Sequence, residues 1–133
     1  MPQYTVEILR ETLNEIEKSI KGTNIGILGL SYKANVGDLR RSPSLEIIKI
    51  LKSKDAKLHL YDPHVTNLST VKNIDELLEK SEALILATNH LEFLQIPAEK
   101  FKEAGIKIII DGKNAFDKDK IKNLGIIYKG IGR

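Results

Sequence analysis

The chain is 133 residues long and 41% hydrophobic, which suffices for one domain with a core of its own. Because it contains no cysteine, a disulfide scaffold, a thiolate nucleophile and a cysteine-ligated metal site are excluded within this chain. The net charge of +3 is mild and only 5% of the residues are aromatic, so no nucleic-acid partner is expected. No apolar run approaches the roughly 20 residues that span a bilayer, and we expect no membrane contact and a cytoplasmic location.

The first predicted element is an amphipathic helix over residues 4–21, with Gly22 as its C-cap. Its apolar side chains recur every three or four residues, at Val6, Leu9, Leu13, Ile16 and Ile20. This helix precedes the first strand, so it is not a crossover inside the sheet. It either packs on this domain or connects it to contacts outside the chain. We expect residues 1–22 to be a connector and residues 23–133 to form the domain.

A strand, a long polar loop, a helix and a second strand are predicted next. The first strand covers residues 24–30, and the loop covers 31–42. A serine N-cap followed by proline indicates the start of the helix over 43–54. The expected inward-facing residues of this helix are Leu45, Ile48 and Leu51, with Ile47 beside them. The second strand covers 57–61.

The rest of the chain alternates short helices with apolar strands. The predicted helices cover 74–80, 97–104 and 118–123, and the predicted strands cover 82–88, 107–110 and 126–128. Near-continuous runs of Ile, Leu and Val indicate strands that are buried on both faces. With right-handed crossovers, this order predicts an α/β fold with a doubly wound, mostly parallel, Rossmann-like sheet flanked by helices.

The candidate ligand site lies in the loops that follow the strands, because ligands of open α/β sheets bind at the carboxyl edge. Three cations occupy the loop after the first strand: Lys33, Arg40 and Arg41. Such groups donate charge-assisted hydrogen bonds to phosphate oxygens, so they indicate a phosphate-bearing ligand. Lys113 is a further candidate after the fourth strand. The simpler alternatives are that Lys33 is an ordinary surface lysine and that Asp111–Gly112 is only a tight turn.

The glycines of the first strand do not form a dinucleotide-binding fingerprint. Gly26 and Gly29 are three residues apart, and the next helix begins more than ten residues later. The G-x-G-x-x-G motif instead leads directly into a helix whose N-terminus meets the pyrophosphate. Asp62 comes too late in the sequence to hold a ribose. We therefore expect that this domain does not bind NAD by itself.

No catalytic or metal-binding set is visible in the sequence. His90 ends the third strand and is expected to be a hydrogen-bonded structural residue. His59 and His64 lack metal-ligand spacing to a partner, and no Ser-His-Asp triad is predicted. Composition and spacing alone thus indicate an anion-binding α/β domain without catalytic residues.

Six segments carry a family resemblance. They are Gly-Leu-Ser-Tyr-Lys (29–33), Gly-Asp-Leu-Arg-Arg-Ser-Pro (37–43), Tyr-Asp-Pro (61–63), Ala-Thr-Asn-His-x-Glu-Phe (87–93), Asp-Gly-Lys-Asn-Ala-Phe (111–116) and Tyr-x-Gly-Ile-Gly-Arg (128–133). In matching order along essentially the whole chain, they resemble the C-terminal domain of the UDP-glucose/GDP-mannose dehydrogenase family. The last two are similar to the ending of UDP-glucose dehydrogenases in particular.

The resemblance implies an enzyme that oxidises a sugar-nucleotide alcohol to a carboxylate in two NAD-dependent steps. Members combine an N-terminal NAD domain, a central helical dimerisation region with a catalytic cysteine, and a C-terminal nucleotide-sugar domain. This chain matches the last of these and has no cysteine. The resemblance therefore implies a fragment that is inactive alone, binds a UDP-sugar, relies on NAD held mainly by an absent domain, and is a homodimer when full length.

Individual roles carry over by motif. Tyr32 and Lys33 resemble the aromatic-lysine pair that contacts the UDP-sugar. Arg40 matches an arginine that reaches the NAD bound by the other domain, whereas Arg41 receives no role. Lys113 stands where UDP-glucose dehydrogenases usually have arginine, and it keeps the charge but lacks the bidentate fork.

The expected function is UDP-sugar binding within an NAD-dependent UDP-glucose 6-dehydrogenase, an oxidoreductase that makes UDP-glucuronate for polysaccharide biosynthesis. The alternatives are the same domain of a UDP-N-acetylmannosamine or GDP-mannose dehydrogenase, and a stand-alone nucleotide-binding module. No metal and no catalytic residue are expected in this chain.

Overall fold

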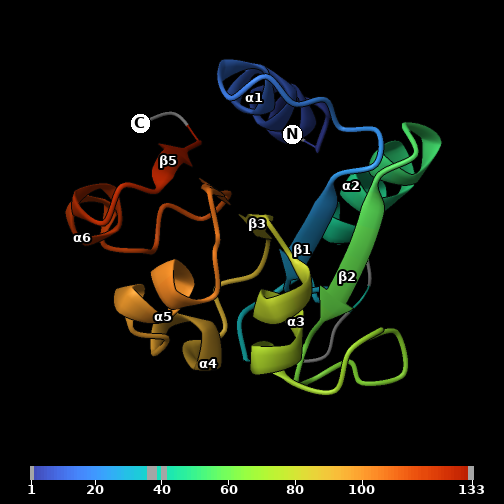
Figure 1. Cartoon of the computed structure of the whole chain (residues 1–133). Helices are drawn as coiled ribbons and strands as arrows, with labels where there is room; N and C mark the ends of the chain where they lie inside the picture. Colours follow the sequence, from blue (N-terminus) through green and yellow to red (C-terminus); the bar gives the residue numbers. More distant parts are fainter. Residues whose placement is uncertain (1, 36–38, 40–41, 132–133) are drawn as a thin grey trace.

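The computed structural model describes residues 2–35, 39 and 42–131. Five strands form one sheet in the order β2-β1-β3-β4-β5, and every pairing in it is parallel (Figure 1). The strands are β1 (Asn24–Leu28), β2 (Lys57–Tyr61), β3 (Ala83–Leu86), β4 (Ile108–Asp111) and β5 (Ile127–Gly130). The structure confirms the predicted α/β, doubly wound, Rossmann-like fold.

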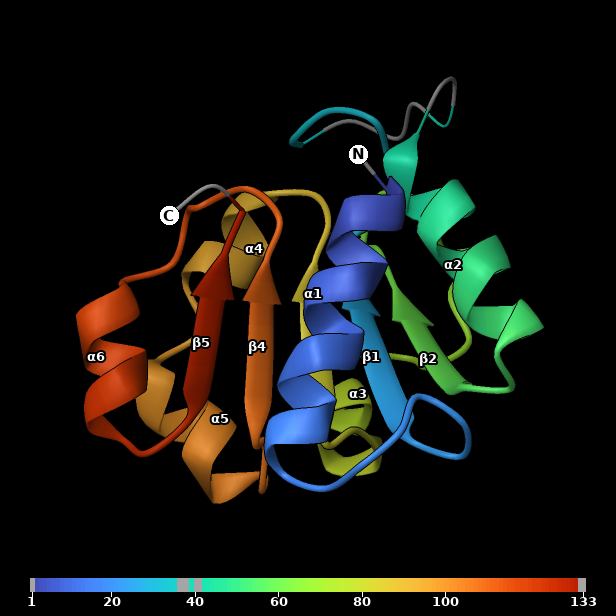
Figure 2. The same cartoon turned by 90° about the horizontal axis from the view of Figure 1, so that it is seen from above.

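Helices cover both faces of the sheet (Figure 2). One face carries α1 (Pro2–Glu15) and α2 (Pro43–Ser53). The other face carries α3 (Ile74–Lys80), α4 (Leu91–Leu94), α5 (Ala98–Glu103) and α6 (Lys118–Asn123). Each face has its own hydrophobic core, and α1 therefore packs on this domain.

Side chains along the central strands alternate between these two cores, as the period of two in a strand requires. Ile25 and Ile27 of β1 face the core beneath α1 and α2, whereas Leu28 faces the other core. Gly26 also faces the second core, where a β-carbon would lie 2.6 Å from the Leu77 side chain of α3. A glycine at this position allows α3 to pack closely against β1.

The predicted end of the first helix is wrong. The helix ends at Glu15 rather than at 21, and Glu17 adopts a left-handed φ of 59°. The Lys18 N–H then donates to the Leu13 carbonyl at 2.9 Å, which closes the last turn. Ile20 is buried, but from the following loop rather than from the helix. Gly22 is therefore not the C-cap. The prediction failed because the apolar spacing of the sequence continues past the end of the helix.

Other differences from the prediction concern α2, α4 and the strand ends. Leu45 is 39% exposed, so its predicted inward position is wrong, and Ile47 fills the core instead. The short helix α4 was not predicted. Strands β1 and β3 each end two residues earlier than expected, because the chain turns away at Gly29 and Ala87.

The order of the strands places a topological switch point between β1 and β3. β1 and β3 are neighbours, but the chain continues from β1 to β2 on one side and from β3 to β4 on the other. The loops that follow β1 and β3 therefore run in opposite directions from adjacent strand ends. Ligands of such sheets bind at this carboxyl edge. Among the described residues, no helix has both the length and the apolar character needed to cross a membrane.

Candidate functional site

Two buried aspartates organise the carboxyl edge of the sheet. Asp62 directly follows β2, and Asp111 is the last residue of β4. Both side chains are fully buried. A buried carboxylate needs hydrogen-bond donors around it, because it loses its contacts with water. The donors show which loops each aspartate holds in place.

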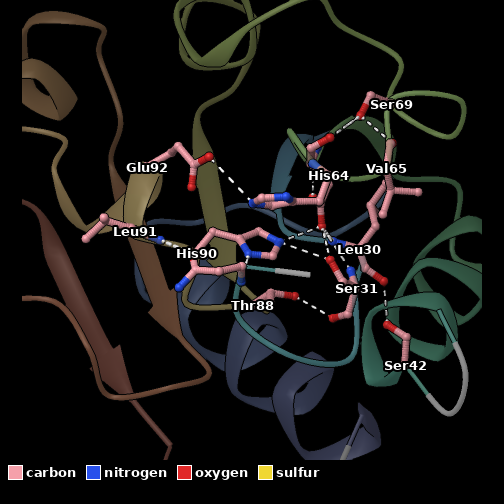
Figure 3. A network of polar contacts seen from close by, with 12 residues as sticks. Leu30, Ser31, Ser42, His64, Val65, Ser69, Thr88, His90, Leu91 and Glu92 are labelled. Carbon is pink, nitrogen blue, oxygen red and sulfur yellow. Dashed lines mark hydrogen bonds and ion pairs between the residues drawn. The ribbon is translucent and has the colours of Figure 1, made fainter. Parts of the chain in front are cut away.

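Asp62 holds the start of the β1–α2 loop. Its Oδ2 accepts hydrogen bonds from the Leu30 N–H (2.7 Å), the Ser31 N–H (3.0 Å) and the Ser31 hydroxyl (2.6 Å) (Figure 3). Its Oδ1 accepts from the His64 N–H at 2.8 Å. Burial by itself raises the pKa of Asp62, but the hydrogen bonds from Ser31, Leu30, His90 and His64 together hold this pKa below its ordinary value. Asp62 is thus a carboxylate at neutral pH.

His90 extends this network across the sheet edge, and its ring is fully buried. Its Nε2 lies 2.9 Å from Asp62 Oδ2 and 3.0 Å from Ser31 Oγ (Figure 3). Its Nδ1 accepts the Asn35 N–H at 2.6 Å. Because a backbone N–H can only donate, Nδ1 carries no hydrogen, and the neutral ring has its hydrogen on Nε2. The prediction of a hydrogen-bonded structural histidine is confirmed.

The Ser31–Asp62–His90 group is not a nucleophilic triad, although it contains the three residue types. In a triad the carboxylate binds Nδ1 of the histidine and the serine binds Nε2. Here Asp62 and Ser31 both contact Nε2, and Nδ1 is occupied by a backbone N–H. All three side chains are buried. In the part of the chain that the structure describes, no group of three His, Cys, Asp or Glu side chains has the arrangement of a metal site.

The β1–α2 loop also packs tightly against the end of β3. Gly29 has a φ of 103°, and a β-carbon there would lie 2.5 Å from Thr88 Cβ. The Thr88 hydroxyl donates to the Ser31 carbonyl at 2.7 Å, and the Ser42 hydroxyl donates to the Leu30 carbonyl at 2.6 Å. These contacts hold the start of the β1–α2 loop against the end of β3 and against Ser42, the residue before α2.

The contacts of Gly26 and Gly29 also show whether this domain has a dinucleotide-binding turn for NAD. Gly26 faces α3 and Gly29 faces Thr88, so neither glycine leaves its backbone open to a pyrophosphate. The helix after β1 begins only at Pro43. The described residues therefore do not fit a self-contained dinucleotide site, because such a site needs a glycine turn that leads directly into a helix.

Asp111 holds the loop after β4. Its Oδ1 accepts the Lys113 N–H at 3.0 Å, and its Oδ2 accepts the N–H groups of Ala115 (2.9 Å) and Phe116 (2.8 Å). The Tyr128 hydroxyl of β5 donates to the same Oδ2 at 2.7 Å. The Asp-Gly turn expected as the simpler interpretation is therefore present. This turn also presents the Lys113 side chain to solvent.

Three of the site residues predicted from the sequence, Tyr32, Lys33 and Lys113, lie on these two loops. Tyr32 is 42% exposed and Lys33 is also exposed, both directly after the anchored Ser31. Lys113 lines a cavity of about 160 Å³ together with Pro2, Thr5, Pro43, Ile47, Ile85, Leu86, Ala87, Gly112 and Ile131. Lys33 is not among the described residues that line this cavity, although both loops lie at the same edge of the sheet (Figure 2). Arg40 and Arg41 lie outside the described residues.

The sequence did not predict that Ser31, Asp62 and His90 form one hydrogen-bonded group. It suggested a role for Asp62 only as a possible ribose ligand, which was rejected, and it predicted a hydrogen-bonded His90 without a named partner. The available signal is that both follow apolar strands of a parallel sheet, whose carboxyl ends meet at one edge. Pairing them with Ser31 requires the strand order, which periodicity alone does not supply.

Comparison with known proteins identifies the class of domain. Residues 26–118 match the family model of the UDP binding domain of the UDP-glucose/GDP-mannose dehydrogenase family. The chain belongs to this family, as the resemblance of its motifs indicated. It is 33% identical to a UDP-N-acetyl-D-mannosamine dehydrogenase of Pyrococcus horikoshii over 100% of this chain and 31% of that protein. It is 31% identical to a UDP-glucose 6-dehydrogenase of Rickettsia felis over 88% of this chain and 29% of that protein.

Solved structures give the same result. A UDP-D-ManNAc dehydrogenase from Pyrococcus horikoshii matches with a TM-score of 0.89 and 32% identity over 99% of this chain and 31% of that one. An NDP-N-acetyl-D-galactosaminuronic acid dehydrogenase from Methanosarcina mazei Go1 matches with a TM-score of 0.91 and 26% identity over 99% of this chain and 29% of that one. The chain thus spans less than a third of the length of these proteins.

Proposed function

We propose that this domain binds the UDP part of a UDP-sugar at its carboxyl edge and serves an NAD-dependent UDP-sugar dehydrogenase. The observation that carries the proposal is the match to the UDP binding domain of the family, over the segment that forms the carboxyl-edge loops. Tyr32, Lys33 and Lys113 lie on those loops, and each loop is anchored by a buried aspartate. The domain positions its ligand and leaves bond-making to residues outside the chain.

The charges at this edge suit a diphosphate. Lys33 and Lys113 are exposed ammonium groups at the sheet edge where ligands of such folds bind. In our proposal they donate charge-assisted hydrogen bonds to the phosphate oxygens, and Tyr32 contacts the UDP-sugar beside them. Arg40 reaches NAD held by a domain absent from this chain. Residues 1–22 lead from the central region, through which the full-length protein forms a homodimer.

Two sugars are candidates for the ligand. UDP-glucose comes first, because segments 111–116 and 128–133 resemble the ending of UDP-glucose dehydrogenases. UDP-N-acetyl-D-mannosamine comes second, because the relative that covers 100% of this chain carries that name. Turnover of each sugar nucleotide by the full-length protein distinguishes them, whereas this chain alone is expected to reduce no NAD.

Isothermal titration of this chain tests the proposal. We expect binding of UDP, weaker binding of GDP and no binding of NAD. Lys33→Met and Lys113→Met are each expected to weaken UDP binding about tenfold, because a hydrogen bond to a charged group contributes roughly 1.5–3 kcal/mol. Lys57→Met is the matched control, since Lys57 is an exposed lysine at the opposite edge of the sheet, where β2 begins. Absence of UDP binding, or equal losses from all three variants, would contradict the proposal.

A further inference from the structure

The loop that carries Tyr32 and Lys33 is held at a second point beyond Asp62. The Asn35 N–H donates to His90 Nδ1 at 2.6 Å, and the Leu91 N–H donates to Asn35 Oδ1 at 3.0 Å. Asn35 has a left-handed φ of 62°, a conformation that asparagine adopts more readily than most residues. The segment is thus fixed at Ser31 on one side and at Asn35 on the other.

We infer that His90 is a positioning residue for ligand binding, which holds Asn35 and thereby fixes Tyr32 and Lys33 in the arrangement that receives the diphosphate. The inference rests on the proposed function. Its physical basis is that a loop ordered before binding does not have to be ordered by the ligand, so less of the binding free energy is lost. His90 touches no ligand in this arrangement and acts through Asn35.

The two nitrogens of His90 have separate tasks. Nε2 donates toward Asp62 and Ser31, which ties the ring to the ends of β1 and β2. Nδ1 accepts from Asn35, which ties the ring to the exposed part of the loop. The ring cannot easily turn, because it packs against Phe93 and His64 with ring centroids 5.5 Å and 4.6 Å away. The Nε2 contact thus holds the Ser31 end of the segment that carries Tyr32 and Lys33, and the Nδ1 contact holds its Asn35 end.

This division allows a matched pair of substitutions at one position. In His90→Asn, the amide oxygen falls near the place of Nδ1 and keeps an acceptor for Asn35. In His90→Gln, the amide nitrogen falls near the place of Nε2 and keeps a donor for Asp62, but Asn35 loses its acceptor. A purely structural histidine predicts similar losses from both variants, since each removes about half of the contacts.

The experiment combines titration with UDP and amide exchange measured by NMR. His90→Gln is expected to weaken UDP binding about tenfold, which corresponds to the loss of about one hydrogen bond. It is also expected to remove the exchange protection of the Asn35 amide. His90→Asn is expected to keep both within about threefold. His59→Gln replaces a β2 histidine whose Nε2 contacts Asn24 rather than His90 or Asn35. It is the control and is expected to leave UDP affinity within about twofold.

Asn35→Gly supplies a test at an exposed position, where replacement does not disturb the core. It keeps the backbone N–H and the left-handed conformation but loses the contact with the Leu91 N–H. We expect UDP binding about threefold weaker and faster exchange of the Leu91 amide.

The possible outcomes separate this inference from the proposed function. Lack of UDP binding by the unmodified chain overturns the proposed function and this inference with it. If UDP binds and His90→Gln weakens it no more than His90→Asn does, the inference alone is overturned.

Discussion

Asp62 and Asp111 both end a strand, are both buried, and both anchor a loop with an exposed lysine, yet their donors come from different distances along the chain. Asp111 is bound by N–H groups two, four and five residues after it, and by the hydroxyl of Tyr128 on the neighbouring strand. Asp62 is bound by Leu30 and Ser31, which precede it by 32 and 31 residues, and by His90, which follows it by 28.

The difference affects how a disturbance spreads. The Asp111 anchor is mostly a local turn, so it forms wherever that short segment forms. One donor to Asp62 is local, the His64 N–H, but the contacts to its Oδ2 come from Leu30, Ser31 and His90, which follow β1 and β3. The Asp62 anchor is therefore complete only when β1, β2 and β3 are already side by side. Damage at Asp111 is therefore expected to stay near the β4–α6 loop, whereas damage at Asp62 reaches three strand ends.

The largest expected effect is that of Asp62→Ala. This change removes the buried acceptor of the Leu30 N–H, the Ser31 N–H and the Ser31 hydroxyl, and it leaves His90 Nε2 with only the Ser31 oxygen. Since each unsatisfied buried donor costs about 1–3 kcal/mol, we expect the free energy of unfolding to fall by roughly 4 kcal/mol. Urea unfolding measures the loss. Asp119→Ala, at an exposed aspartate in the first turn of α6, is the control and should cost less than about 0.5 kcal/mol.

Amide exchange then shows whether the damage spreads. In Asp62→Ala, exchange is expected to accelerate at Leu30, Ser31 and Asn35, because His90 loses its main partner. If only residues next to position 62 exchange faster, the distinction between the two anchors is wrong.

A smaller and more local effect is expected for Asp111→Ala. The free energy of unfolding should fall by about 3 kcal/mol, because the Phe116 N–H and the Tyr128 hydroxyl lose a buried acceptor. Tyr128→Phe removes only one donor to this carboxylate and should cost about 1 kcal/mol. Faster exchange should be confined to residues 112–116 and β5. Accelerated exchange at Leu30 would show instead that the two anchors are coupled.

The smallest effect is a pH dependence of the free energy of unfolding that arises from Asp62. Its pKa in the folded chain lies below the ordinary value of 3.8, so as the pH falls the unfolded chain takes up this proton first. The stabilisation by Asp62 is therefore complete above about pH 5 and is lost as the pH falls through the folded pKa. Asp62→Asn, which has no proton to gain, should flatten the fall of the unfolding free energy between pH 5 and 3. Equal slopes for both proteins would contradict this expectation.

The sequence allowed most elements to be predicted, and the errors have local causes. The first helix was predicted too long because buried Ile20 continues the apolar spacing from within a loop. Leu45 was predicted to face inward because it is spaced three and six residues before Ile48 and Leu51, whereas its side chain at the start of α2 is 39% exposed. The four-residue helix α4 is too short to show a period.

By itself, the sequence determined the alternation of helices and strands, the parallel sheet and the tight turn at Asp111, because apolar periodicity and turn chemistry are properties of neighbouring residues. Only the tertiary structure decided that Asp62 holds Ser31 and that His90 offers Nδ1 to Asn35. Those contacts join residues 31 and 55 positions apart. They arise because parallel pairing brings separate strand ends to one edge, where buried donors and acceptors must find each other in place of water.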